Sequence, residues 1–102
     1  MKRFSKVLVA MLIAALLVPS MAMAADITVV FVPKLTGNAF FESANDGAQK
    51  YAAEQGFTVT YDGNPEASVA NQVAVIQNAI NSGADAICVS SVDATGLDDI
   101  MK

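Results

Sequence analysis

Hydrophobic and polar residues follow two different repeats along the chain after residue 24. Three short segments rich in β-branched and apolar residues predict strands, namely Ile27–Val32, Phe57–Tyr61 and Ala86–Ser90. The first is apolar at almost every position, as in a strand covered on both faces, whereas the second alternates apolar and polar residues. Pro33 cannot donate a hydrogen bond to a neighbouring strand and therefore ends the first strand.

Two longer segments between the strands carry apolar residues at spacings of three and four, which predicts amphipathic helices. We expect these helices from about Ala39 to Gln55 and from about Ser68 to Ser82. The apolar stripes consist of Phe41, Ala44, Ala48, Tyr51 and Ala52 in the first helix and of Val69, Val73, Ile76 and Ile80 in the second.

Capping residues mark the ends of these helices. Asn38 is the expected N-cap of the first helix, and Gly56 and Gly83 end the two helices. A third helix is expected to begin near Gly96 and to run to Lys102. The resulting order, βαβαβα with short connections, predicts an α/β fold with a parallel sheet and right-handed crossovers.

The first 24 residues have the pattern of an export signal and are set apart from the fold. Basic residues precede Val7–Val18, a run of twelve apolar residues. Ala22-Met23-Ala24 supplies the small-x-small pattern of a signal peptidase site, so cleavage is expected after Ala24. As a membrane anchor, twelve helical residues would span about 18 Å, too little for a hydrocarbon core of about 30 Å. The sequence therefore predicts a periplasmic product that is not embedded in the membrane after cleavage.

Charge and composition exclude several functions for residues 25–102. Three lysines stand against ten acidic residues there, a net charge of −7, which argues against nucleic acids and anionic lipids as partners. The chain has no histidine, so the usual zinc and Ser-His-Asp chemistries are excluded, and one cysteine allows no internal disulfide. Cys88 is interpreted as a small buried core residue. We therefore expect no enzyme, no metal and no cofactor.

A ligand site is expected where the strand order reverses. With the order 2-1-3, that point lies beyond the carboxyl ends of the first and third strands. The two loops that meet there, Pro33–Phe41 and Ser90–Thr95, offer an ammonium, an amide, two phenyl rings, hydroxyls and a carboxylate. Such a set suits a small neutral polyhydroxyl ligand. The candidate ligand-binding residues are Lys34, Asn38, Phe40, Phe41, Ser91 and Asp93.

These candidates also have structural interpretations. Lys34 can be a solvated loop lysine, and Asp93 can cap the third helix. One of the two phenyl rings must serve the apolar stripe, and helical spacing assigns Phe41 to the core more readily than Phe40. The single glycine of the loop, Gly37, does not make a phosphate-binding motif.

Three segments resemble periplasmic sugar-binding proteins of the ribose-binding type, and most closely the autoinducer-2-binding receptors among them. They are Phe31–Phe41, Val59–Val69 with the following Gln72-Val73, and Asp85–Ser90, and the likeness covers essentially all of residues 26–102. The pattern Asn-x-Phe-Phe at residues 38–41 is shared across the wider family. Pro33-Lys34-Leu35 together with Tyr61-Asp62-Gly63 is narrower, although rhamnose-binding relatives are similar around the lysine.

The resemblance implies a two-lobed protein that closes on autoinducer-2 or a similar small sugar and delivers it to the membrane subunits of an ABC importer. A lysine after the first strand contacts the ligand in these receptors, and that role falls on Lys34. The asparagine and phenylalanines of the same loop line the cleft, which transfers to Asn38, Phe40 and Phe41. No family role is transferred to Asp93.

In that family, residues 25–102 would form half of an N-terminal lobe. The third strand would lack its outer neighbour, so we expect the isolated segment to fold poorly and to bind no sugar measurably. The alternatives are a rhamnose- or ribose-type binding protein, a truncated product that binds nothing, and a receiver-like signalling domain. A receiver needs an acidic pair after its first strand, and residues 33–38 contain no acid.

Overall fold

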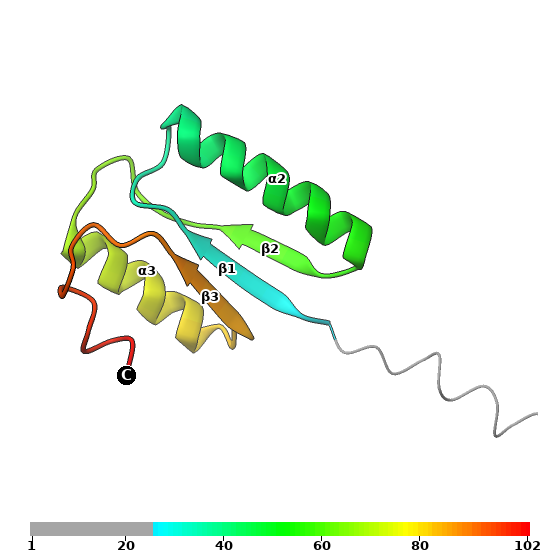
Figure 1. Cartoon of the computed structure of the whole chain (residues 1–102). Coiled ribbons are helices and arrows are strands. Elements are labelled where there is room, and N and C mark those ends of the chain that lie inside the picture. Colours follow the sequence, from blue (N-terminus) through cyan, green and yellow to red (C-terminus); the bar gives the residue numbers. More distant parts are fainter. Residues whose placement is uncertain (1–25) are drawn as a thin grey trace, which may run out of the picture.

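The computed structural model describes residues 26–102 (Figure 1). The predicted signal segment, residues 1–24, and its cleavage site lie outside the described residues. Five elements follow one another, namely β1 (Thr28–Val32), α2 (Ala39–Gln55), β2 (Thr58–Tyr61), α3 (Val69–Asn81) and β3 (Ala86–Val89). Each agrees with its predicted range to within one residue at either end.

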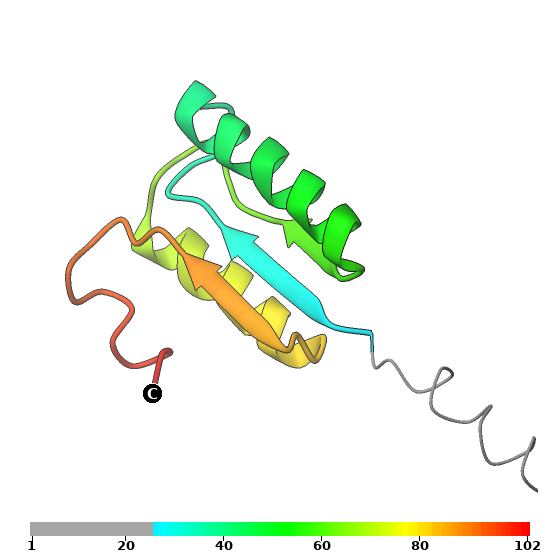
Figure 2. The ribbon, with the colours of Figure 1, turned by 45° about the vertical axis from the view of Figure 1, so that its right-hand side comes forward.

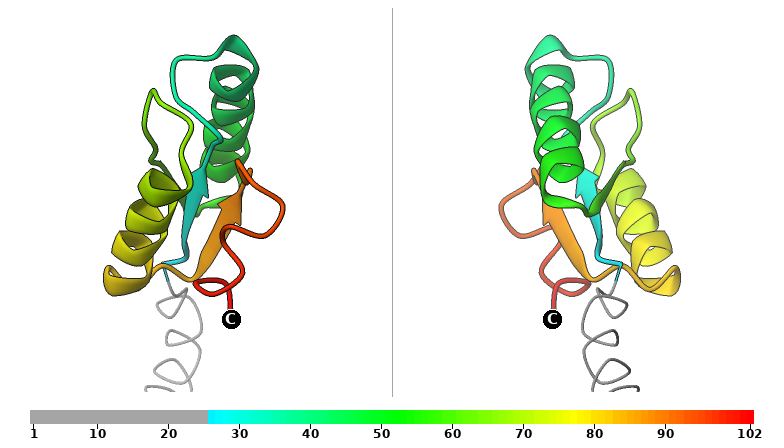
Figure 3. Two further views of the ribbon diagram at one scale, coloured as in Figure 1. Left: turned by 90° about the vertical axis from the view of Figure 1, so that its left-hand side faces the viewer. Right: turned by 90° about the vertical axis from the view of Figure 1, so that its right-hand side faces the viewer.

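The three strands form one parallel sheet in the predicted order, β2-β1-β3. Phe31 in the central strand lies opposite Tyr61 on one side and Cys88 on the other. The helices cover opposite faces of this sheet, as the views along it show (Figure 3). Because all strands run the same way, their carboxyl ends share one edge, and the connecting loops leave the sheet there (Figure 2).

The core lies on the α3 side of the sheet. Its buried members come from β1, from α3 and from the segment after β3, and they are Val30, Val32, Val75, Ile76, Ala79 and Leu97. On the opposite face α2 packs chiefly against β2 and buries a single residue, Ala52. The α3 side is therefore well covered, whereas the α2 side is covered mainly over β2.

The predicted apolar stripes are correct only in part. Ala52 and Ile76 are buried as expected, but Tyr51 and Ile80 are 57% and 48% exposed. Tyr51 lies beside Phe57 in an edge-to-face pair with ring centroids 5.9 Å apart. Because α2 leans over the outer strand β2, the side of the helix that carries Tyr51 faces away from the sheet.

The predicted helix ends are confirmed. The side chain of Asn38 accepts a hydrogen bond from the backbone N–H of Phe40 and caps α2. Gly56 ends α2 with φ at 81°, a left-handed conformation that costs glycine little, and its N–H donates to the carbonyl of Ala52. Ser68 caps α3 by accepting from the N–H of Asn71 at 3.0 Å.

The third helix predicted from Gly96 does not form. Residues 96–101 make turns instead, in which the N–H of Asp98 donates to the carbonyl of Thr95 and the N–H of Met101 to that of Leu97. Packing against the core, and not local helix propensity, decides the conformation of this segment. Leu97 is buried against the core, and the order of the described elements is βαβαβ, not βαβαβα.

The prediction that Cys88 is buried is also wrong, because its side chain is exposed. Cys88 and Phe31 are paired across the sheet and face the α2 side, whereas Val30 and Val32 face α3. Since α2 lies over β2, no helix of the described part covers this side of β3. A buried cysteine would need cover on that face.

Candidate functional site

Two loops leave the carboxyl edge of the sheet beside each other, residues 33–38 after β1 and residues 90–95 after β3. They carry all of the predicted ligand-binding residues except the two phenylalanines, which open α2. The connection after β2 is bonded to the first of these loops, since the N–H of Thr36 donates to the carbonyl of Asn64 at 2.9 Å. The predicted meeting of loops at this edge is therefore present in the fold.

One side chain of α3 ties the two loops together. The amide of Gln72, only 4% exposed, donates through Nε2 to the carbonyls of Pro33 and Ser90 at 3.1 and 2.8 Å. Its Oε1 accepts from the N–H of Val92 at 3.0 Å. Gln72 thus satisfies backbone groups of both loops at once. The sequence pattern alone assigned Gln72 no role, although a polar residue on the inward face of an apolar helix is a usable signal.

Glu42 holds the loop after β1 at its other end. Its Oε1 accepts hydrogen bonds of 2.9 Å from the N–H of Gly37 and from the hydroxyl of Tyr61. Partial burial and then the neighbouring carboxylate raise the pKa of Tyr61 to about 12. The carboxylate lies in the first turn of α2, where the helix dipole favours a negative charge. Loop, helix and strand are therefore fixed to one another at this point.

The candidates at the start of α2 divide into a capping residue and two rings of unequal exposure. Oδ1 of Asn38 accepts from the N–H of Phe40 at 3.0 Å, so its amide NH2 is the group that remains to donate to a ligand. The rings of Phe40 and Phe41 meet edge to face with centroids 5.1 Å apart. Phe40 is 73% exposed and Phe41 is half-buried, so Phe41 is the more buried ring, as predicted, although it is not part of the core.

Lys34 is exposed in the loop directly after the buried Pro33. The single ion pair among residues 26–102 joins Lys102 to Asp99 at 3.7 Å, so the ammonium of Lys34 is not held by a carboxylate of this part of the chain. The exposed ammonium is therefore available to bind a hydroxyl or an oxyanion.

Ser91 and Asp93 form a local turn in the loop after β3. The hydroxyl of Ser91 donates to the carbonyl of Asp93, whose carboxylate accepts from the N–H groups of Thr95 and Gly96 at 2.9 and 2.8 Å. These two hydrogen bonds, with Thr95 the stronger influence, lower the pKa of Asp93. Oδ1 of Asp93 therefore has a capping role, as its structural interpretation predicted, although turns follow instead of a helix.

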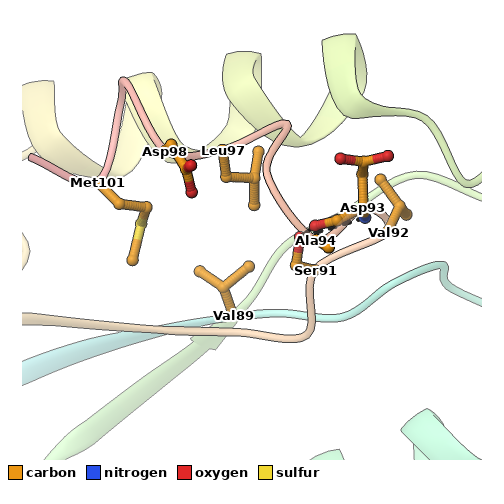
Figure 4. A pocket seen from close by; sticks show the side chains of 8 residues that line it. All are labelled: Val89, Ser91, Val92, Asp93, Ala94, Leu97, Asp98 and Met101. Atoms are coloured by element: carbon orange, nitrogen blue, oxygen red, sulfur yellow. Dashed lines mark hydrogen bonds between the residues drawn. The ribbon is translucent and has the colours of Figure 1, made fainter.

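The same two residues line an open hollow of about 430 Å³ on the outer side of β3 (Figure 4). Its apolar walls come from β3 and from the segment that follows, and the lining residues are Val89, Ser91, Val92, Asp93, Ala94, Leu97, Asp98 and Met101. None of the candidates in the loop after β1 or at the start of α2 is among them. The structure thus brings Ser91 and Asp93 together but does not join them with Lys34 in one cavity.

A second, smaller hollow of about 230 Å³ lies between α3 and the strands β1 and β2, lined by Thr28, Val30, Thr60, Asp62, Asn78, Ala79 and Ser82. It holds no predicted residue. Within residues 26–102, no cluster of His, Cys, Asp or Glu is arranged to bind a metal ion. Nor does this part of the chain contain a helix with the length and apolar character needed to cross a membrane.

Comparison with known proteins identifies the fold. Residues 29–102 match the family described as periplasmic binding protein domain. The chain belongs to the periplasmic binding protein family. A solved structure of LsrB from Clostridium saccharobutylicum in complex with AI-2 is 62% identical to it, with a TM-score of 0.70. The match covers 72% of this chain and 22% of LsrB, so the chain spans only a small part of this relative.

These matches confirm the predicted resemblance to ribose-type periplasmic binding proteins and to the autoinducer-2 receptors among them. The α/β architecture with a parallel sheet is that of part of a periplasmic binding protein lobe. The family and this relative are binding proteins and not enzymes. The chemistry of the two loops is therefore considered as ligand recognition.

Proposed function

We propose that this chain is part of the substrate-binding component of an ABC importer that captures AI-2 or a similar small sugar. The observation that carries the proposal is its 62% identity to LsrB, whose structure was solved in complex with AI-2. At that level of identity, the loops beyond the sheet are expected to keep their conformation as well as the fold. The proposal includes no enzymatic activity.

The two loops are the proposed ligand-binding surface of this part. Lys34 donates its ammonium to ligand oxygens, and the amide of Asn38 donates beside it. Phe40, 73% exposed, offers its ring to the C–H face of a sugar. Ser91 and the free carboxylate oxygen of Asp93 extend the same edge from the loop after β3. Charged and amide groups of this kind give directional hydrogen bonds to hydroxyls.

We propose that the protein acts in the periplasm and that its chain consists of a signal segment and part of one lobe. Residues 1–24 are the cleavable signal, and residues 25–102 form part of the N-terminal lobe. The membrane subunits of the importer are the proposed partners. Mass spectrometry of the periplasmic fraction is expected to find a protein that begins at Ala25. An uncleaved chain that stays with the cytoplasmic fraction would contradict this assignment.

The decisive experiment is a ligand screen on the full-length product of the locus. Its thermal unfolding is measured alone and with AI-2, ribose or rhamnose, because a ligand that binds only the folded state raises the melting temperature. AI-2 is expected to give the largest shift, with calorimetry to confirm binding. A larger shift with rhamnose or ribose would assign the site to that sugar, and no shift with any of the three would refute ligand capture.

A further inference from the structure

Gln72 is the one polar side chain that is buried among residues 26–102. Burying an amide is costly unless its donors and acceptor all find partners. Both N–H groups and the carbonyl of this amide are engaged, and every partner is a backbone group of the two candidate loops: the carbonyls of Pro33 and Ser90 and the N–H of Val92. Helix α3 therefore places the side-chain amide of Gln72 between the loop after β1 and the loop after β3, where the two strands cease to pair.

The register of the sheet shows what this group replaces. Val32 lies opposite Val89, and its carbonyl accepts from the N–H of Ser90 at 2.9 Å. In a parallel ladder, the next residue of β1 to bond in this direction lies two positions on. If the β1–β3 ladder continued by one more step, the N–H of Lys34 would donate to the carbonyl of Ser90, and the carbonyl of Lys34 would accept from the N–H of Val92. Those two groups are the ones that Gln72 binds.

We propose that Gln72 is a positioning residue whose side-chain amide takes the place of the backbone N–H and C=O of Lys34 in the β1–β3 ladder. The strand pairing is thereby completed without the backbone of Lys34, which leaves the sheet and carries its side chain into the exposed loop. The second hydrogen of Nε2 also satisfies the carbonyl of Pro33, a residue without an N–H of its own. One side chain thus determines how far the two loops stand apart.

The consequence for binding rests on the proposed function. Lys34 and Ser91 belong to different loops, and a ligand that contacts both depends on their separation. Binding to a preformed pair of loops costs less than binding to loops that must first be ordered. Loss of the Gln72 amide is therefore expected to weaken ligand capture even though Gln72 is buried beneath the loops.

The test compares two glutamines of the same helix in the full-length product. Gln72→Met keeps the length of the side chain and removes its hydrogen bonds, whereas Gln72→Glu keeps an acceptor for Val92 but aims a carboxylate at two carbonyls. Gln77→Met and Gln77→Glu are the controls, because Gln77 is exposed and bonds only to the side chain of Asn81, at 3.0 Å. Amide hydrogen exchange and AI-2 affinity are measured for all four.

Gln72→Met is expected to speed exchange at the Val92 and Thr36 amides about tenfold or more, relative to Val30 in the core strand, and to weaken AI-2 binding at least as much. The Gln77 variants are expected to change neither. A lower melting temperature with unchanged affinity at a temperature where the protein is folded would reduce Gln72 to a structural residue and overturn the proposal. Unchanged loop exchange would overturn it as well.

Two further outcomes are informative. If both Gln72 variants fail to fold while the Gln77 variants fold, Gln72 is required for folding and the positioning role is refuted. If the unsubstituted product does not bind AI-2, the proposed function fails by itself. The exchange measurement needs no ligand and still decides whether Gln72 holds the two loops.

Discussion

The hydroxyl of Tyr61 donates a 2.9 Å hydrogen bond to the carboxylate of Glu42, which joins the end of β2 to the first turn of α2. The same carboxylate oxygen accepts from the N–H of Gly37, in the loop that carries Lys34. Gln72 holds the beginning of that loop and Glu42 holds its end. The loop is thus attached at both ends, as expected of a rigid ligand-binding surface.

Replacing Tyr61 by phenylalanine is expected to lower the free energy of unfolding by about 1 kcal/mol, the contribution of one partly buried hydrogen bond. The ring and its contact with Phe31, at 5.3 Å between centroids, would remain. Urea unfolding of the full-length product measures the change. Tyr51→Phe is the matched control, since Tyr51 is 57% exposed, and an equal loss in both variants would contradict the role of the Tyr61 hydroxyl.

The Tyr61–Glu42 pair also predicts a dependence of stability on alkaline pH. The pKa of Tyr61 rises from 10.0 to about 12 in the folded protein, so folding favours the protonated phenol. Its contribution to stability is complete below pH 10 and is lost as the pH rises toward 12. Carbon-13 NMR of labelled tyrosine is expected to show a lower pKa for Tyr61 in Glu42→Gln. An unchanged pKa would leave burial as its sole cause.

The two adjacent phenylalanines are expected to separate stability from binding. Phe41→Ala should lower the free energy of unfolding by about 1–2 kcal/mol, less than the roughly 3–5 kcal/mol of a fully buried phenylalanine, because the ring is only half-buried. Phe40→Ala should change stability little, since Phe40 is 73% exposed, but should weaken AI-2 binding. Urea unfolding and calorimetry on both variants test this, and the reverse pattern would exchange their roles.

Residues 25–102 alone are expected to show no cooperative thermal transition and no measurable sugar binding. The outer edge of β3 has no partner strand within the described residues, and Cys88 is exposed on the side that α2 leaves open. An unpaired apolar edge favours aggregation over a stable fold. Circular dichroism on heating tests the first expectation and calorimetry the second. A cooperative transition with millimolar or tighter binding would contradict both.

The sequence predicted the elements and their order because the signals for them are local. Asn38 and Gly56 mark the ends of α2, and the β-branched run before Pro33 marks β1. The burial of Cys88 was mispredicted because it depends on where α2 lies over the sheet, which no local pattern reports. Gly96 was mispredicted as the start of a helix because the burial of Leu97 in the core determines the conformation of the residues around it.

The site was predictable to the level of the loops. The topological rule places Lys34 and Ser91 at the same edge of the sheet, and the structure agrees. The bonds that hold these loops were not predictable, because Gln72 and Glu42 reach them from separate helices. The sequence marks Gln72 only as a polar residue on the inward face of its helix. The loop groups that Gln72 and Glu42 bind are backbone groups, which carry no sequence signal. Only the three-dimensional register connects Gln72 with the place of Lys34 in the ladder.

Lys34→Ala is the most direct test of the ligand site. The ammonium is exposed and has no carboxylate partner in the described part of the chain, so its removal should barely change the free energy of unfolding. Removing a charge-assisted hydrogen bond to the ligand should weaken AI-2 binding by about 1.5–3 kcal/mol. Calorimetry on the full-length product measures the affinity, and urea unfolding measures the stability.

Lys50→Ala is the control for the lost charge, because Lys50 is also exposed but lies in the last two turns of α2, away from both loops. Long-range attraction alone would weaken binding equally in both variants and would depend strongly on salt. If Lys34 contacts the ligand directly, Lys34→Ala weakens AI-2 binding at every salt concentration, whereas Lys50→Ala leaves it unchanged. Reduced stability with unchanged affinity in Lys34→Ala would show instead that Lys34 supports the loop and that the ligand binds elsewhere.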